Sequence, residues 1–226
     1  MAFRAALLSL PTVSIAGSIE DIFGRSGIYS NSAVKGEERA ASVEWLPGAA
    51  GGPSFQVDCG LRIAGGWSRR KDVSLKHSFS LRFRERYGAA RLDRAVIPGA
   101  AVSSFDVLRL RAGQADAFYF SAHRAQYLHD QWARDTQRDM GWLSPGGSFV
   151  HLYVNGLYWG VYNLAEEPTA SFMADHVGGD ERDWDVIKEG GVVGGEWVPE
   201  VEDGNDAAFE AMRGILREQP APRPDE

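Results

Sequence analysis

The sequence predicts an α+β fold that is mostly antiparallel sheet with one long helix. Short stretches rich in β-branched and aromatic residues lie between Gly and Pro, one stretch free of Gly and Pro has helical spacing, and one Asn-Gly pair favours a tight hairpin. The 226 residues are 44% hydrophobic and 24% charged. This composition is typical of an ordinary folded domain and argues against intrinsic disorder.

Seven segments are predicted to be strands because their apolar residues alternate or cluster between turn residues. They are residues 12–16, 42–46, 55–64, 76–83, 106–111, 149–154 and 157–164. In residues 76–83 the alternation places Phe79 and Leu81 on one face. The opposite face then carries a row of cations and hydroxyls, which are Lys76, Ser78, Ser80, Arg82 and Arg84.

The hairpin and the helices follow from local signals. Asn155-Gly156 lies between two predicted strands and favours a type I′ turn, which needs positive φ at both central residues. Residues 122–140 lack Gly and Pro and end before Gly141, so they are predicted to form a long helix of about five turns. A second helix is expected to begin after an Asn205 cap.

The formal charge of −7 conceals a strong asymmetry. Residues 1–165 carry 19 basic and 14 acidic side chains, whereas residues 166–226 carry 5 and 17. Within the first part, residues 62–94 hold ten basic side chains against three acidic ones, so this stretch is expected to attract an anion such as phosphate. The backbone N–H groups of the Gly65-Gly66 loop could surround that anion, with Lys76 close behind. The alternative is a plain hairpin turn beside a solvated basic face.

Other functional classes find little support. The pI near 5.3 and the lack of any nucleic-acid-binding motif argue against a nucleic-acid partner. The five histidines lack the spacing of a zinc site, the single Cys59 cannot form an internal disulfide, and no G-x-S-x-G elbow indicates a serine hydrolase. No apolar run of about 18 residues predicts a membrane segment, and the N-terminus lacks the features of a signal peptide.

The Asp130–Arg134 spacing favours surface ion pairs on a helix.

Nine short strings occur in a fixed order along the chain. They are PTVSI (11–15), GIYS (27–30), ASVE (41–44), GLRIAGGWSR (60–69), KHSFSLRF (76–83), RLRAG (109–113), DQWARD (130–135), HLYVNGLYWGVYNLAE (151–166) and DWDVIK (183–188). In content and order they resemble the spore coat protein H (CotH) kinase family of atypical kinases, and the resemblance spans about residues 11–188.

This resemblance implies an atypical protein-kinase-like N-lobe followed by the start of a C-lobe. It implies ATP and Mg²⁺ as cofactors and a protein substrate rich in Ser. By resemblance, the helix with Asp130 and Arg134 takes the place of the regulatory helix, and Glu166 leads into the segment beside the adenine. The residues that the resemblance assigns to the nucleotide phosphates are Arg62, Gly65, Gly66, Ser68, Arg69 and Lys76.

The resemblance has one departure. The family's later Trp-Asp-x-Asp type motif, which carries the catalytic and metal-binding aspartates, has no match, so no catalytic or metal residue is assigned. The chain is therefore expected to be an N-terminal fragment that is inactive alone. The expected organisation is a kinase-like portion over residues 1–188, an acidic segment with a helix over 189–218 and a disordered tail over 219–226. The alternative is a non-catalytic binding or structural module of a large extracytoplasmic protein, and the sequence specifies no location.

Overall fold

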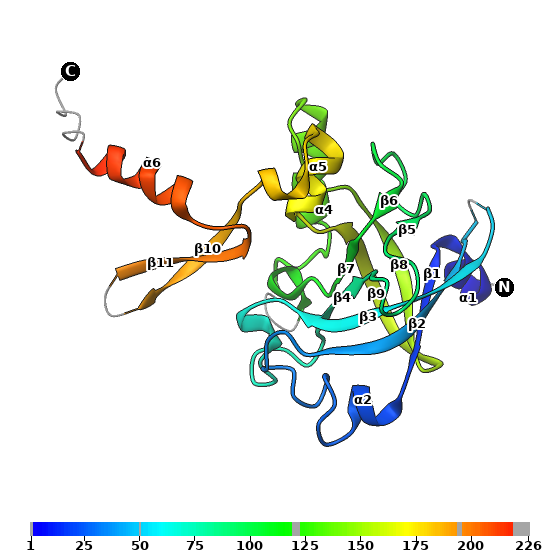
Figure 1. Ribbon diagram of the computed structural model, residues 1–226. Helices are drawn as coiled ribbons and strands as arrows, with labels where there is room; N and C mark the ends of the chain where they lie inside the picture. Colours follow the sequence, from blue (N-terminus) through cyan, green and yellow to red (C-terminus); the bar gives the residue numbers. More distant parts are fainter. Residues whose placement is uncertain (1, 50, 119–122, 194–195, 219–226) are drawn as a thin grey trace. The chain divides into compact units, whose positions relative to one another are not determined.

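The computed structural model describes residues 2–49, 51–118, 123–193 and 196–218, and the chain divides into two compact units, residues 1–167 and 168–226. The first unit is a closed barrel of seven strands (Figure 1), in the order β1-β2-β3-β4-β7-β9-β8. Every neighbouring pair is antiparallel except β1 and β8, which run parallel and close the barrel. The strands are β1 (Thr12–Gly17), β2 (Glu38–Leu46), β3 (Phe55–Ala64), β4 (Ser78–Arg82), β7 (Val107–Arg111), β8 (Gly147–Val154) and β9 (Leu157–Glu166).

The remaining elements are short. The first unit also contains α1 (Ala2–Ser9), α2 (Ile19–Phe23), η1 (Trp67–Arg69), β5 (Leu92–Asp93), β6 (Ser104–Phe105), η2 (Gln114–Asp116) and α4 (His129–Asp139). The second unit contains α5 (Ala170–Val177), η3 (Glu181–Asp183), the two-stranded sheet β10 (Val186–Val193) with β11 (Glu196–Asp203), and α6 (Ala207–Glu218). The side chain of Asn205 accepts a hydrogen bond from the Ala207 N–H at 2.9 Å, so the helix predicted after this residue is present.

The predicted fold class was wrong. A kinase-like N-lobe with one long helix was expected, whereas the seven strands close into a barrel and the helices are short. The long helix fails because Tyr127 has φ +60°, a left-handed conformation that a right-handed helix cannot contain. The carboxylate of Asp116 accepts hydrogen bonds from the backbone N–H groups of Gln126 and His129, which fixes this turn, and α4 starts only at His129. Residues 122 and 219–226, to which the predictions also extended, lie outside the described residues.

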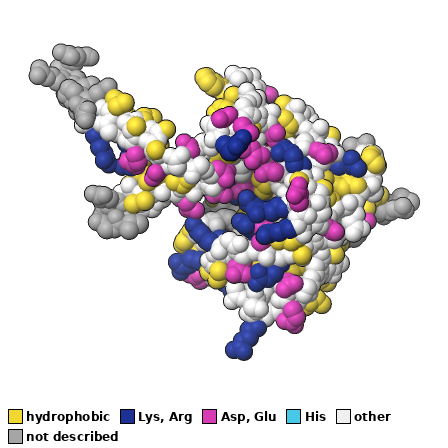
Figure 2. Space-filling view, viewed as in Figure 1, with side chains coloured by type: hydrophobic (Ala, Val, Ile, Leu, Met, Phe, Trp, Pro, Cys, Tyr) yellow, Lys and Arg dark blue, Asp and Glu magenta, His cyan; other side chains and the backbone are white. Residues whose placement is uncertain are grey.

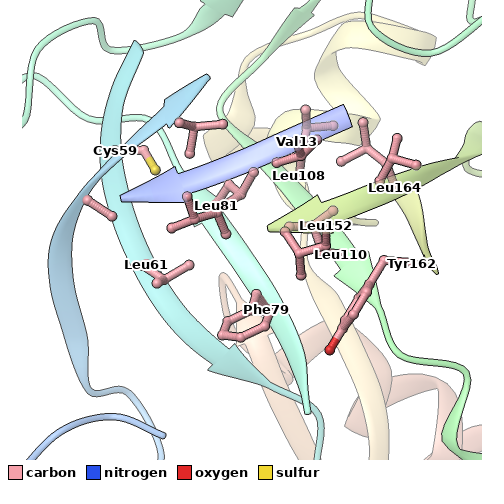
Figure 3. Close-up of a cluster of buried hydrophobic side chains, with 14 of the residues drawn as sticks. Val13, Cys59, Leu61, Phe79, Leu81, Leu108, Leu110, Leu152, Tyr162 and Leu164 are labelled. Atoms are coloured by element: carbon pink, nitrogen blue, oxygen red, sulfur yellow. The ribbon is translucent and has the colours of Figure 1, made fainter. Parts of the chain in front are cut away.

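The barrel interior is filled by every second residue of its strands, as the alternation predicts. Leu61, Phe79, Leu110 and Leu152 are completely buried, and Figure 3 shows side chains from neighbouring strands packed against one another. Residues between them point outward, and one face of the barrel shows basic and acidic side chains side by side (Figure 2). The cations on the barrel strands therefore point to the outside because the inside of the barrel leaves no room for water.

The predicted Asn-Gly hairpin is present between β8 and β9. Asn155 has φ +48° and Gly156 has φ +79°, as a type I′ turn requires. The Asn155 side chain also accepts a hydrogen bond from the Gly17 N–H at 2.9 Å, and its own N–H donates to the Ile15 carbonyl at 2.8 Å. The hairpin tip thus holds the end of β1 against β8. No helix among residues 2–49, 51–118, 123–193 and 196–218 is long and apolar enough to cross a membrane.

Truncation of one interior side chain tests this packing. Leu110→Ala removes a fully buried side chain and should lower the free energy of unfolding by about 2–5 kcal/mol. Leu75→Ala, at a position that is 77% exposed, should change it by less than about 0.5 kcal/mol. Urea unfolding followed by tryptophan fluorescence measures both, and equal small effects would contradict the packed barrel.

Candidate functional site

A cleft lies on the outer face of the barrel, where β7, β8 and β9 meet residues 111–118 and 127–131. It consists of two cavities of about 350 Å³ each that share four lining residues, Arg111, Gly113, Asp116 and Asp130. The first cavity is also lined by Lys76, Phe118, Tyr127, Gln131, Phe149, Val161 and Asn163. The second is also lined by Gly65, Ser68, Ser78, Arg109 and His129. The cleft therefore combines aromatic walls with several cations.

Lys76 lies two residues before the start of β4 and reaches into the first cavity. Its Nζ donates a hydrogen bond to the Val161 carbonyl at 2.8 Å and lies over the rings of Tyr162 and Tyr127, 4.4 and 5.6 Å from their centroids. Among the described residues, no carboxylate lies within ion-pair distance of this ammonium. Burial lowers the pKa of Lys76 from 10.5 to about 8. Lys76 is thus a desolvated cation held by carbonyl and aromatic groups only.

The two carboxylates of the cleft are already engaged. Asp130 pairs with the guanidinium of Arg111 at 2.9 Å and with that of Arg134 at 3.1 Å. Asp116 accepts the two backbone hydrogen bonds that fix the turn before α4 and pairs with the His129 ring at 2.8 Å. Burial opposes ionisation of Asp116, but these interactions outweigh it and hold the pKa of Asp116 below its ordinary value. Both side chains therefore order the cleft.

Part of the predicted phosphate loop belongs to this cleft. Gly65 and Ser68 line the second cavity. Gly65 has φ +108°, and a Cβ atom at this position would lie 2.6 Å from the Ser68 Oγ, so the loop requires glycine here. Gly66 precedes η1 and faces open space. The structure therefore brings Gly65, Ser68 and Lys76 to one cleft.

The other predicted site residues make different contacts. Arg62 pairs with Glu38, its Nε 2.5 Å from the carboxylate. Arg69 is 5% exposed and donates hydrogen bonds to the backbone carbonyls of Ser32 and Val34. Glu166 is buried at the end of β9 and accepts a hydrogen bond from the Gly146 N–H at 2.6 Å. Arg62, Arg69 and Glu166 are absent from the walls of both cavities of the cleft. A role of these three residues in nucleotide binding stays a prediction.

Sequence reasoning missed Arg111, Asp116 and Tyr127 as cleft residues. Arg111 occurs in the RLRAG string, and its alternation with the buried Leu110 could have placed it on the outer face. Asp116 and Tyr127 carry no such signal, because turns bring them to the cleft. Arg134 does more than form the predicted surface pair with Asp130, because it also donates to the Asn163 side chain and to the carbonyls of Pro145 and Gly146. Arg134 therefore links α4 to the barrel through these hydrogen bonds.

The described residues do not form a magnesium site from protein side chains alone. Within the described part of the chain, no three His, Cys, Asp or Glu side chains come together to hold a metal ion. In the cleft, the two carboxylates face cations or backbone donors, whereas kinases hold Mg²⁺ with one or two carboxylates together with substrate phosphates.

Comparison with known families agrees with the resemblance drawn from the sequence strings. Residues 61–216, well over half of the chain, match the family model described as CotH kinase protein, and the chain therefore belongs to this family. No curated protein matches the chain.

The half-buried ammonium of Lys76 predicts a specific dependence of stability on pH. Its pKa is about 8 in the folded chain and 10.5 ordinarily, so between these values the unfolded chain binds more protons. The Lys76 contribution to the free energy of unfolding should therefore rise as the pH increases from 8 to 10.5. Urea unfolding of the wild type and Lys76→Met should show the wild type gaining stability relative to the variant over this window and no relative change between pH 6 and 7. Parallel profiles throughout would contradict a depressed pKa.

Proposed function

We propose that this chain forms the nucleotide-binding part of a CotH-type kinase, which transfers the γ-phosphoryl group of ATP to serine or threonine of a Ser-rich protein. Membership of the CotH kinase family supports the reaction class. One observation carries the nucleotide site: the ammonium of Lys76 lies in a cavity of about 350 Å³ without a carboxylate partner among the described residues. A phosphate group would supply the missing negative charge.

The walls of the cleft suit the two ends of a nucleotide. Phe118, Tyr127 and Phe149 offer aromatic faces against which a purine can stack. Lys76 and Arg111 supply positive charge for the phosphates, and the Gly65 loop with Ser68 adds backbone and hydroxyl donors in the adjoining cavity. Asp130 orients the Arg111 guanidinium from one side, which leaves its other donors for a ligand.

Phosphoryl transfer is a separate matter from binding. In kinases, Mg²⁺ neutralises the charge that develops on the phosphates, and the described residues of this chain do not form a site for that ion from side chains alone. We therefore assign nucleotide binding to this chain and derive no step of the transfer through Mg²⁺. Lys76 positions the phosphates as a point charge, and the aromatic walls exclude water from one side of them.

The second candidate is a non-catalytic module that holds an anionic partner. The engaged carboxylates of Asp116 and Asp130 favour it, since they leave the cleft without a metal site. Such a module would bind simple anions and ATP alike, whereas a nucleotide site would prefer ATP because its purine stacks on the aromatic walls.

Binding of ATP to the full chain tests the proposal. Lys76→Met should weaken ATP binding about tenfold or more, since a charge-assisted contact contributes about 1.5–3 kcal/mol, and it should not lower the melting temperature because it removes a partly desolvated charge that has no carboxylate partner among the described residues. Lys71→Met, at an exposed position in the neighbouring loop, is the matched control and should change the affinity less than twofold. Isothermal titration with ATP, and with tripolyphosphate as the purine-free comparison, measures these effects.

Two results would separate the candidates. Equal affinity for ATP and tripolyphosphate would favour the anion-holding module over the kinase. Equal, small effects of Lys76→Met and Lys71→Met would contradict a phosphate site at Lys76 altogether.

A further inference from the structure

A second concentration of cations lies at the far end of β4 from Lys76. We call it the arginine cluster, and it consists of Glu38, the three arginines that pair with it (Arg62, Arg84 and Arg86) and Arg82 on β4. Arg62 lies on β3 opposite Glu38 on β2, whereas Arg84 and Arg86 follow the end of β4. The proposed nucleotide cleft contains none of these residues, so the cluster goes beyond the proposed function.

The Glu38 carboxylate forms the centre of the cluster. Its side chain is only 5% exposed, and it pairs with Arg62 at 2.5 Å, with Arg84 at 3.8 Å and with Arg86. The carboxylate lies directly over Gly60, because a Cβ atom at this glycine would be 2.5 Å from Glu38 Oε1 and 2.7 Å from the ring of Tyr87. A glycine inside a strand here makes room for the carboxylate. The arrangement is therefore built into the sheet.

The positive charge of the cluster exceeds what Glu38 can neutralise. Arg82 lies on β4 directly opposite Gly60 and has no ion pair among the described residues. The 3.8 Å between Arg84 and Glu38 is too long for a hydrogen bond, so the Arg84 donors are not satisfied by this carboxylate. Asp58 and Glu85 neighbour the cluster in sequence, but neither forms an ion pair with it in the described part of the chain.

The pKa shifts of Glu38 and Arg84 agree with this excess of positive charge. Burial opposes ionisation of Glu38, but hydrogen bonds from Arg86 and Tyr87 and the charges of Arg62 and Arg84 hold its pKa below the ordinary value. Burial also lowers the pKa of Arg84, and repulsion from Arg82, Arg62 and Arg86 lowers it further against the attraction of Glu38. A second anion beside Arg82 and Arg84 would remove this repulsion.

We propose that the arginine cluster binds a phosphate monoester carried on a protein side chain. Guanidinium groups present planar pairs of N–H donors that match phosphate oxygens bidentately, and Arg82 and Arg84 have donors to offer. The excess charge is confined to one small group of side chains, so one dianionic group fits this site better than a long polyanion such as nucleic acid. The partner is thus a protein or peptide with a phosphorylated residue.

Fluorescence polarisation with the full chain tests the proposal. The probe is a labelled neutral peptide with one phosphoserine, compared with the same peptide unphosphorylated, with inorganic phosphate as competitor and with a DNA duplex as competitor. The phosphopeptide should bind, the unphosphorylated peptide should bind at least tenfold more weakly, and phosphate should compete. Arg82→Gln combined with Arg84→Gln should weaken phosphopeptide binding tenfold or more without lowering the melting temperature by more than a few degrees.

Two variants serve as matched controls. Arg70→Gln removes an exposed arginine that is paired with Asp72 and should leave phosphopeptide binding within twofold of the wild type. Lys76→Met should do the same, which separates this site from the nucleotide cleft whatever the outcome there. Equal binding of both peptides, no effect of the double variant, or stronger binding of the DNA duplex than of the phosphopeptide would overturn the proposal.

Discussion

The parallel pairing of β1 with β8 is the constraint on which the barrel depends. It joins Thr12–Ile15 to His151–Val154, segments far apart in sequence, and without it both strands would present unpaired edges. The Asn155 side chain and the carbonyl of Pro11, which accepts a hydrogen bond from the His151 N–H at 2.8 Å, hold the two strands in register. Once the barrel is closed, each strand has only one face on which a charged side chain can remain solvated.

The distribution of charge follows from that closure. Alternation fixes Phe79 and Leu81 inside and sends the polar residues of the same strand outward, so the basic stretch of residues 62–94 becomes a surface with two different ends. Near one end, Lys76 lies among aromatic rings and carbonyls without a carboxylate. At the other, three arginines pair with Glu38, and Arg82 lies on the neighbouring strand. Both ends keep positive charge that the described residues do not neutralise, which is why each is suited to a phosphate.

Local patterns predicted the local features and not the long-range ones. The alternation in residues 55–64 and the Asn155-Gly156 turn depend on neighbouring residues, so both were predicted. The barrel depends on the β1–β8 pairing, and the shortened helix depends on Tyr127 and its turn, for which no periodicity exists. The basic composition of residues 62–94 predicted an anion site near Lys76. Composition could not show that two of the predicted residues have other partners, because backbone carbonyls bind the Arg69 guanidinium and Arg62 pairs with Glu38.

The central claim is that Lys76 is a half-buried cation whose natural counter-charge is a bound phosphate. NMR titration of the Lys76 side chain, with the resonance assigned by comparison with Lys76→Arg, measures this most directly. The structure predicts a titration midpoint near the pKa of about 8 in the free chain and a higher midpoint with ATP bound, because a neighbouring anion favours the charged form. A midpoint near 10.5, the ordinary value, that does not move when ATP is added would contradict the claim.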